Sequence, residues 1–146
     1  NPPVVHHGMV TSTLAAFDDP AVGMCGPKLI HPAGDIQTTG IRTWHGGGNA
    51  GGEELKDDSP SRDVDGVTGA AMVIRKDVWN TCGGMCELYD LGYEDVDLCL
   101  TVRESGWRVR YVAESTIVHH EGASGSERWR SVHANVALMQ QRWAHR

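Results

Sequence analysis

Apolar residues in the C-terminal half of the chain recur at two different spacings. Over residues 95–105, and again over about 126–145, they recur every three or four positions, which predicts two amphipathic helices. Between these helices, WRVRYV (107–112) alternates apolar with polar residues and TIVHH (116–120) is a short apolar run, so we predict two strands. Gly106 is expected to end the first helix, because glycine readily adopts the left-handed conformation that closes helices.

The N-terminal half carries shorter apolar runs separated by turn residues. Residues 8–18 predict a helix that the turn sequence DDP closes. The pieces VGMCG (22–26) and KLIH (28–31) are divided by a Gly-Pro pair, and the β-prone DIQTTGI (35–41) follows a turn signal. We therefore expect several short strands or extended edges after the first helix.

The middle of the chain continues this mixture of elements. AAMVI (70–74) is a continuous apolar run, typical of a strand buried on both faces. Residues 75–82 predict a short helix that Gly83 and Gly84 end. Strands interspersed with helices indicate an α/β fold, but the order of the strands in the sheet does not follow from this pattern.

One long segment has no hydrophobic period at all. Residues 42–63, which include HGGGNAGGEE, are rich in Gly, Asn, Asp, Glu and Ser. Long loops in compact domains are usually functional or disordered. We predict a flexible Gly-rich loop over 42–63, acting either as a lid over a binding site or as a disordered excursion.

Length, charge and cysteine usage limit the classes of protein to consider. A chain of 146 residues predicts one domain over 1–146. The formal net charge of −6 and the lack of a dense Lys/Arg cluster argue against nucleic acid as a partner. There is no apolar run of membrane-spanning length, and the start NPPVVHHGM lacks the pattern of a signal peptide. Four cysteines without the rhythm of a disulfide scaffold favour a reducing compartment, the cytoplasm.

Three carboxylates crowd the start of the predicted helix in GYEDVDLCL (92–100), namely Glu94, Asp95 and Asp97. A carboxylate in the first helical turn interacts with free backbone N–H groups and with the positive end of the helix dipole, which suits a general base. The same residues are also common as helix caps. Local sequence alone favours the cap over a catalytic role.

A second cluster of polar residues, HHEGAS, follows a predicted strand. Imidazole is a common ligand of Mn²⁺ and Zn²⁺, and α/β folds place ligand-binding groups at strand ends. His119 and His120 point to opposite faces if the strand persists, so only one should face a given site. A surface pair is the alternative. Cys82 and Cys86 could join a zinc site, but their three-residue gap is not the tight spacing of a zinc knuckle.

Taken in order, three blocks of the chain resemble the second half of a family 2 glycosyltransferase of the GT-A fold, in the group of rhamnosyltransferase-like enzymes. They are DDPAVGMCGPKLIHPAGDIQTTG, VDGVTGAAMVIRKDVWNTCGGMCE and LGYEDVDLCLTVRESGWRVRYVAESTIVHHEGAS. The resemblance spans most of residues 14–124 and keeps the order and approximate spacing of the family's motifs. It implies a partial GT-A fold, a mixed sheet with flanking helices that lacks the Rossmann-like donor-binding half.

The resemblance also implies roles for individual residues. Asp95 corresponds to the catalytic base, with Glu94 beside it and Asp97 supporting the helix. The base would take a proton from the hydroxyl of a sugar acceptor as that oxygen attacks the anomeric carbon of a nucleotide-diphosphate sugar, with inversion. His119, or His120 as second choice, corresponds to a residue that binds the divalent metal, Mn²⁺ or Mg²⁺. A further strip is expected to line the acceptor side: Thr68, Gly69 and Ala70.

Two departures from the family pattern bear on activity. The donor-binding half should precede these blocks, and the metal motif aligns with Asn1-Pro2-Pro3, where Pro3 replaces the key Asp. Proline has neither a carboxylate nor an N–H group. We therefore expect a truncated chain that is inactive alone and that pairs with a second copy or with a donor-half subunit. The alternatives are a glycan- or protein-binding module without catalysis and an enzyme completed in trans.

Overall fold

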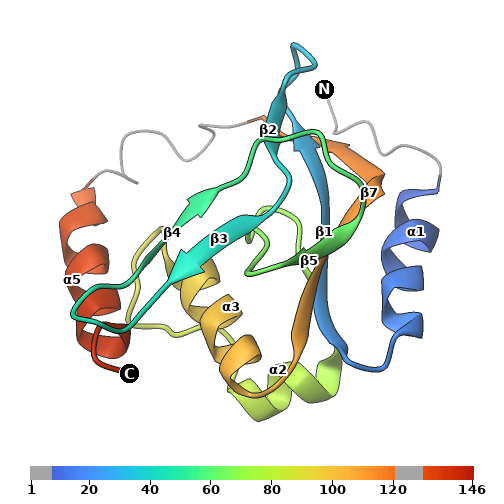
Figure 1. The fold of residues 1–146 in the computed structure, drawn as a ribbon. Coiled ribbons are helices and arrows are strands. Elements are labelled where there is room, and N and C mark those ends of the chain that lie inside the picture. Colours follow the sequence, from blue (N-terminus) through green and yellow to red (C-terminus); the bar gives the residue numbers. More distant parts are fainter. Residues whose placement is uncertain (1–7, 121–129) are drawn as a thin grey trace.

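Strand β1 (Val22–Ile30) lies at the centre of the main sheet in the computed structural model, which describes residues 8–120 and 130–146 (Figure 1). The long strand β7 (Arg108–Val118) runs parallel to it on one side. On the other side, β2 (Ile36–Thr38) and β6 (Val73–Ile74) pair antiparallel with successive parts of β1. β5 (Arg62–Val64) pairs antiparallel with β7, so the sheet is mixed, as the resemblance implies.

Helices cover both faces of this sheet (Figure 1). Helix α1 (Met9–Ala15), extended by the 3₁₀ turn η1 (Ala16–Asp18), packs on one face. Helices α2 (Lys76–Cys82) and α3 (Glu94–Glu104) lie on the other, and α5 (Val132–Trp143) packs on the far side of α3. The predicted α/β class with flanking helices is confirmed. No helix in the described part of the chain is long and apolar enough to cross a membrane.

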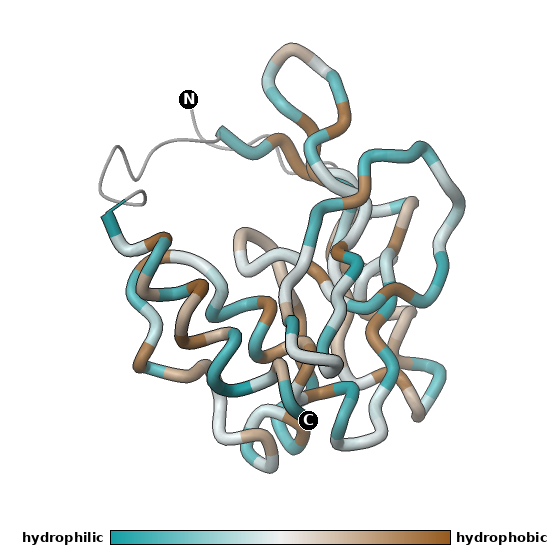
Figure 2. Tube along the Cα trace, turned by 60° about the vertical axis from the view of Figure 1, so that its left-hand side comes forward, coloured by the Kyte–Doolittle hydropathy of each residue, from teal (hydrophilic) through white to brown (hydrophobic). Residues whose placement is uncertain are grey.

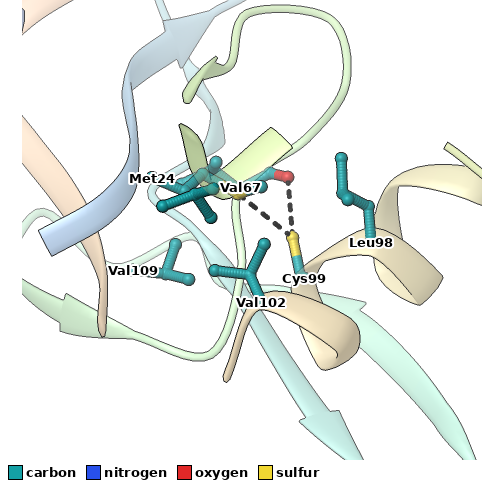
Figure 3. Close-up of a cluster of buried hydrophobic side chains, with 7 residues drawn as sticks. Met24, Val67, Leu98, Cys99, Val102 and Val109 are labelled. Atoms are coloured by element: carbon teal, nitrogen blue, oxygen red, sulfur yellow. Dashed lines mark hydrogen bonds between the residues drawn. The ribbon is translucent and has the colours of Figure 1, made fainter. Parts of the chain in front are cut away.

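Helix α3 is buried on two sides, because the apolar residues between Val96 and Val102 face both the sheet and α5. Towards the sheet it joins a cluster of seven buried residues: Met24, Val67, Val78, Leu98, Cys99, Val102 and Val109 (Figure 3). Towards α5 it joins a second: Ile41, Ala50, Tyr89, Val96, Leu100, Met139 and Trp143. Hydrophobic and hydrophilic positions alternate along the tube in Figure 2, as expected for elements with one buried face. Burial of each large apolar side chain stabilises the fold by about 1.5–3 kcal/mol. Because α3 contributes side chains to both clusters, both hold this helix in place.

In two places, a pair of short strands predicted from the sequence forms one continuous strand in the structure. VGMCG and KLIH are both parts of β1, which continues through Pro27, and WRVRYV and TIVHH are both parts of β7. The pairing partner of β1 jumps from Val112 to Thr116 between Pro27 and Lys28. A proline cannot donate to a ladder of hydrogen bonds, and such irregularities are where a sheet tolerates it. The Gly-Pro pair therefore marks a bulge and not a break.

The segment 42–63, predicted as a loop, contains a hairpin of β3 (Ile41–Trp44) and β4 (Gly51–Glu54), and β5 begins near its end. A Cβ on Gly51 would lie 2.7 Å from the Trp44 ring, so that ring packs directly over the glycine of the opposite strand. The segment is therefore not a loop throughout, and its pairing escaped prediction because such cross-strand contacts produce no hydrophobic period. Flexibility of the segment remains a prediction.

Two further differences concern element lengths. AAMVI contributes only Val73–Ile74 to the sheet, because residues 68–71 form a turn, in which the Ala71 N–H donates to the Thr68 carbonyl at 3.3 Å. Val73 and Ile74 are half-buried, so this strand is not buried on both faces. The C-terminal helix α5 begins at Val132, and residues 126–129 of its predicted range lie outside the described residues. The short helix ending at Gly83, with a φ of 80°, is confirmed.

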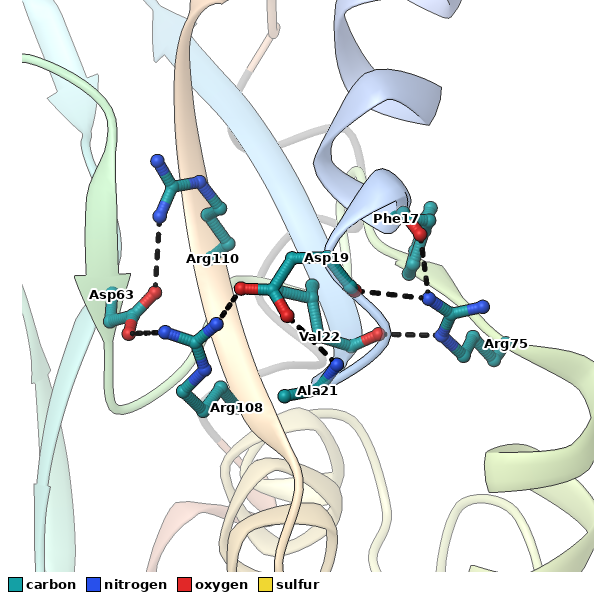
Figure 4. A network of polar contacts seen from close by, with 8 residues as sticks. All are labelled: Phe17, Asp19, Ala21, Val22, Asp63, Arg75, Arg108 and Arg110. Carbon is teal, nitrogen blue, oxygen red and sulfur yellow. Dashed lines mark hydrogen bonds and ion pairs between the residues drawn. The ribbon is translucent and has the colours of Figure 1, made fainter.

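Arginine side chains tie the ends of several elements together (Figure 4). The Arg75 guanidinium donates to the carbonyl oxygens of Val22 (2.6 Å) and Phe17 (2.8 Å) and stacks over the Phe17 ring at 5.1 Å. Arg108 bridges Asp19, before β1, and Asp63 of β5. Since these ion pairs are exposed, each contributes at most about 1 kcal/mol.

All four cysteines are free, and two of them are fully buried. Burial raises the pKa of Cys25 and of Cys99 to about 12. At pH 8 we therefore expect iodoacetamide to label these two thiols about a thousandfold more slowly than an ordinary exposed thiol. Peptide mass spectrometry of the native protein should find label on Cys82 and Cys86, and labelling in guanidinium, the control, should reach all four. Equal native labelling of all four would contradict the described burial.

Candidate functional site

Six of the seven residues predicted for the site surround one hollow at the N-terminal end of α3. The hollow measures about 280 Å³ and is called here the His119 hollow. Its lining includes Thr68, Gly69, Ala70, Glu94, Asp95 and His119. The seventh, His120, is exposed and does not line it, as expected for the residue after His119 in an extended segment.

Asp95 is held by the backbone at both of its carboxylate oxygens. Oδ2 accepts the N–H of Gly69 at 2.9 Å, and Oδ1 accepts the N–H of Val96 at 2.8 Å. A Cβ on Gly69 would come within 3.3 Å of the Asp95 Cβ, so glycine allows the close approach of this strip. An ionised carboxylate has about four acceptor positions. Among the described residues two of these positions on Asp95 are filled, by Gly69 and Val96, and the other two can accept a hydroxyl in the hollow.

The turn before Asp95 is strained. Tyr93 has a φ of 72° and is the one non-glycine residue with a positive φ in the part of the chain that the structure describes. A bulky residue in this conformation costs about 1–3 kcal/mol and persists only where its surroundings hold it. Glu94 supports the turn, because its Oε2 accepts the N–H of Gly92 at 2.6 Å. The N-cap residue of α3 is Tyr93, without a side-chain cap hydrogen bond, so the expectation that Glu94 or Asp95 is the N-cap is wrong and Glu94 instead holds the turn before the helix.

A second hollow of about 280 Å³, called here the hairpin hollow, adjoins the first. It shares six residues with the first: Glu54, Thr68, Leu91, Gly92, Tyr93 and Asp95. Its remaining lining comes from the β3–β4 hairpin and from α5, including Gly52 and Asn135. Asp95 therefore borders both hollows, so its carboxylate is within reach of groups bound in either one.

His119 is oriented by a buried partner. Its Nδ1 lies 3.0 Å from Oε1 of Gln37, which is 4% exposed. An amide oxygen only accepts, so Nδ1 carries the proton, and Nε2 of the neutral ring is the nitrogen left for a ligand. Metal-binding histidines have this kind of support.

The described residues do not fit a metal ion held by the protein itself. Across residues 8–120 and 130–146, no group of three or more His, Cys, Asp or Glu side chains gathers closely enough to hold one. His119 is a single donor, and Cys82 and Cys86 form no zinc site with it. Residues 1–3, where the family's metal motif aligns, lie outside the described residues.

Asp97 is a structural residue that joins α3 to α5. It is 2% exposed, and its Oδ2 accepts from Arg142 Nε (2.6 Å), Trp143 Nε1 (2.8 Å) and the Tyr89 hydroxyl (2.9 Å). Burial, followed by the charge of Asp97, raises the pKa of Tyr89, and the bond to Asp97 raises the pKa of Arg142. The support of the helix implied for Asp97 is therefore a contact between two helices.

Sequence reasoning missed several residues at the site. Gln37, Glu54, Leu91 and Tyr93 line the His119 hollow, and Asn135 lines the hairpin hollow. Gln37, Leu91 and Tyr93 lie inside the blocks that resemble the family, whereas Glu54 and Asn135 lie outside them. Gln37 is the middle residue of the short strand β2, and its local sequence carries no signal that it faces the site.

Comparisons with known proteins agree with the fold. A profile of the glycosyltransferase-like family 2 matches residues 57–144, more than half of the chain. An O-antigen biosynthesis protein of Myxococcus xanthus is 30% identical over 131 residues, which cover 83% of this chain and 10% of that protein. A pre-mycofactocin glycosyltransferase of Mycobacterium tuberculosis is 31% identical over 113 residues, which cover 77% of this chain and 24% of that protein.

A third relative is the N-acetylglucosaminyl-diphospho-decaprenol L-rhamnosyltransferase of Mycobacterium tuberculosis. It is 32% identical over 63 residues, which cover 43% of this chain and 20% of that protein. The chain spans 10–24% of the length of these three curated relatives. The family profile covers β5, β6, α2, α3, β7 and α5 in full, and its range includes the site residues Thr68, Asp95 and His119. The chain therefore belongs to the glycosyltransferase-like family 2.

Proposed function

We propose that this chain supplies the catalytic base and the acceptor side of an inverting sugar transfer from a nucleotide-diphosphate sugar to an acceptor hydroxyl. The observation that carries the proposal is the Asp95 carboxylate, which the Gly69 and Val96 N–H groups hold where it borders both hollows. Asp95 takes the proton of the acceptor hydroxyl, whose oxygen forms the new bond to the anomeric carbon. The bond from that carbon to the diphosphate breaks, and the nucleoside diphosphate leaves with its electron pair.

The two hollows suggest where the two substrates bind around Asp95. We propose that the sugar acceptor contacts Thr68, which lines both hollows, and the neighbouring Gly69 and Ala70, which line the His119 hollow. His119, with Nε2 free, would contact the diphosphate. Divalent metals are used widely in this family, but because the described residues hold no complete metal site, the proposed steps use none.

We further propose that transfer requires a donor-binding half in addition to these residues. The chain spans a small share of its relatives, and α1 exposes two apolar side chains, Val10 (59%) and Leu14 (54%), beside an apolar hollow of about 200 Å³. A donor half packed there would cover this face. Light scattering that shows a dimer would instead assign the face to a second copy. The free cysteines support a cytoplasmic location, which redox-sensitive labelling in cells would test.

Calorimetry with nucleotide sugars tests the division between donor and acceptor sides. We expect no heat from UDP-glucose, UDP-N-acetylglucosamine or dTDP-rhamnose up to millimolar concentration, with or without Mn²⁺, when the 146-residue chain is alone. Saccharides should still shift the NMR signals of residues 68–70, and Thr68→Val should weaken that binding about tenfold by removing one hydrogen bond. Ser59→Ala, outside both hollows, is the control. Metal-dependent binding of a nucleotide sugar would contradict the need for a separate donor-binding half. If no saccharide shifts the NMR signals of residues 68–70, the acceptor role is contradicted.

A further inference from the structure

Asn135 of α5 grips the turn that leads into the catalytic helix. Its side chain is buried, and Nδ2 donates to the carbonyl oxygens of three successive residues: Asp90, Leu91 (3.3 Å) and Gly92 (2.9 Å). Oδ1 accepts the N–H of Asp90 at 3.2 Å, and the Ser131 hydroxyl donates to the Asp90 carboxylate. The one side-chain amide of Asn135 therefore binds both an N–H group and carbonyl oxygens of this backbone segment.

Residues 90–92, which Asn135 binds, end directly before the strained residue Tyr93. Gly92 has a φ of 112° and Tyr93 a φ of 72°, and α3 begins at Glu94. An unfavourable conformation of a bulky residue persists only where neighbouring contacts determine it. Because Asp95 follows within three residues of Gly92, the direction of its carboxylate depends on this turn.

We propose that Asn135 is a positioning residue, which aims the Asp95 carboxylate by holding residues 90–92. This inference rests on the proposed role of Asp95 as base, and Asn135 acts through the turn and not on the reacting atoms. Its consequence is that α5 controls the geometry of a residue to which it has no direct hydrogen bond in the described structure.

Helix α5 provides a matched control for this role. Gln140 grips another backbone segment in the same two-sided way, since its Oε1 accepts the N–H of Ala50 at 2.9 Å and its Nε2 donates to the Ala50 carbonyl at 2.5 Å. Ala50 belongs to the connection between β3 and β4 and does not line either hollow. Gln140→Ala therefore removes comparable bonds from the same helix and leaves the turn before Asp95 intact.

The test follows the amide signal of Gly69, which donates to Asp95, by ¹⁵N NMR of the 146-residue chain at neutral pH. We expect Asn135→Ala to shift this signal towards that of a free amide and Gln140→Ala to leave it unchanged, with circular dichroism verifying that both are folded. Asn135→Ser, which keeps one donor, should shift it less. An unchanged Gly69 signal in folded Asn135→Ala would overturn the proposal. So would unfolding of both Asn135 variants, which would assign Asn135 to overall stability.

Kinetics separates this inference from the proposed function. In an assembly that transfers sugar, Asn135→Ala should lower kcat about 10- to 100-fold with little change in the KM of the donor, because small displacements of a catalytic group have effects of this size. Gln140→Ala should retain kcat. A shifted Gly69 signal without transfer in any assembly would refute the function and leave the positioning role standing, while a normal kcat in Asn135→Ala would refute the positioning role alone.

Discussion

Replacement of Asp95 by asparagine is expected to lower the rate of sugar transfer about 10²- to 10⁴-fold, the usual contribution of a general base. Asparagine has nearly the same shape and can still accept one of the two backbone N–H groups that Asp95 binds, those of Gly69 and Val96. Its amide cannot take a proton from the acceptor. The measurement is the initial rate of nucleoside diphosphate release in an assembly that contains the donor half, together with the Kd of the nucleotide sugar, which should not change.

Glu94→Gln is the matched control for this substitution. It removes the same charge from the neighbouring residue, but glutamine can still accept the N–H of Gly92 that Glu94 binds. We expect its rate to stay within a few-fold of the original. Equal losses in the two variants would point to the field of the acidic cluster as a whole and would contradict the assignment of Asp95 as base.

The elements around Asp95 were predictable because their signals are local. Helical spacing over 95–105, a glycine after each short helix and polar residues after a strand each depend on a few neighbouring residues. The resemblance then indicated that Asp95 is the carboxylate of the cluster that corresponds to the catalytic base. For this reason six of the predicted site residues, from Thr68 to His119, were found around one hollow.

The missed features depend on contacts between distant parts of the chain. Local preference places glycine or asparagine at a positive φ, yet Tyr93 adopts one, held by Asn135 from a helix more than forty residues later. The β3–β4 hairpin depends on packing of Trp44 over Gly51. Such pairings become visible only when the faces of the elements are known, because no local propensity encodes them.

Replacement of Asp97 by alanine is expected to destabilise the domain by about 3 kcal/mol, because it leaves the Arg142 guanidinium and the Trp143 and Tyr89 donors without their shared acceptor. The value is at the lower end for a broken buried ion pair, since the Arg142 side chain is 32% exposed and can reach water. For a domain of this size we expect the Tm to fall by about 6–12 °C. Urea unfolding followed by circular dichroism measures the loss.

A double-mutant cycle shows whether this loss comes from the contact between the helices. Arg142→Ala alone should be clearly destabilising, whereas adding it to Asp97→Ala should cost little, because the partner of the guanidinium is already gone. A coupling of at least about 1 kcal/mol is expected for residues in direct contact. Strictly additive losses would mean that Asp97 stabilises α3 alone, and α5 would then have to be held beside the catalytic helix mainly by the apolar contacts of Met139 and Trp143.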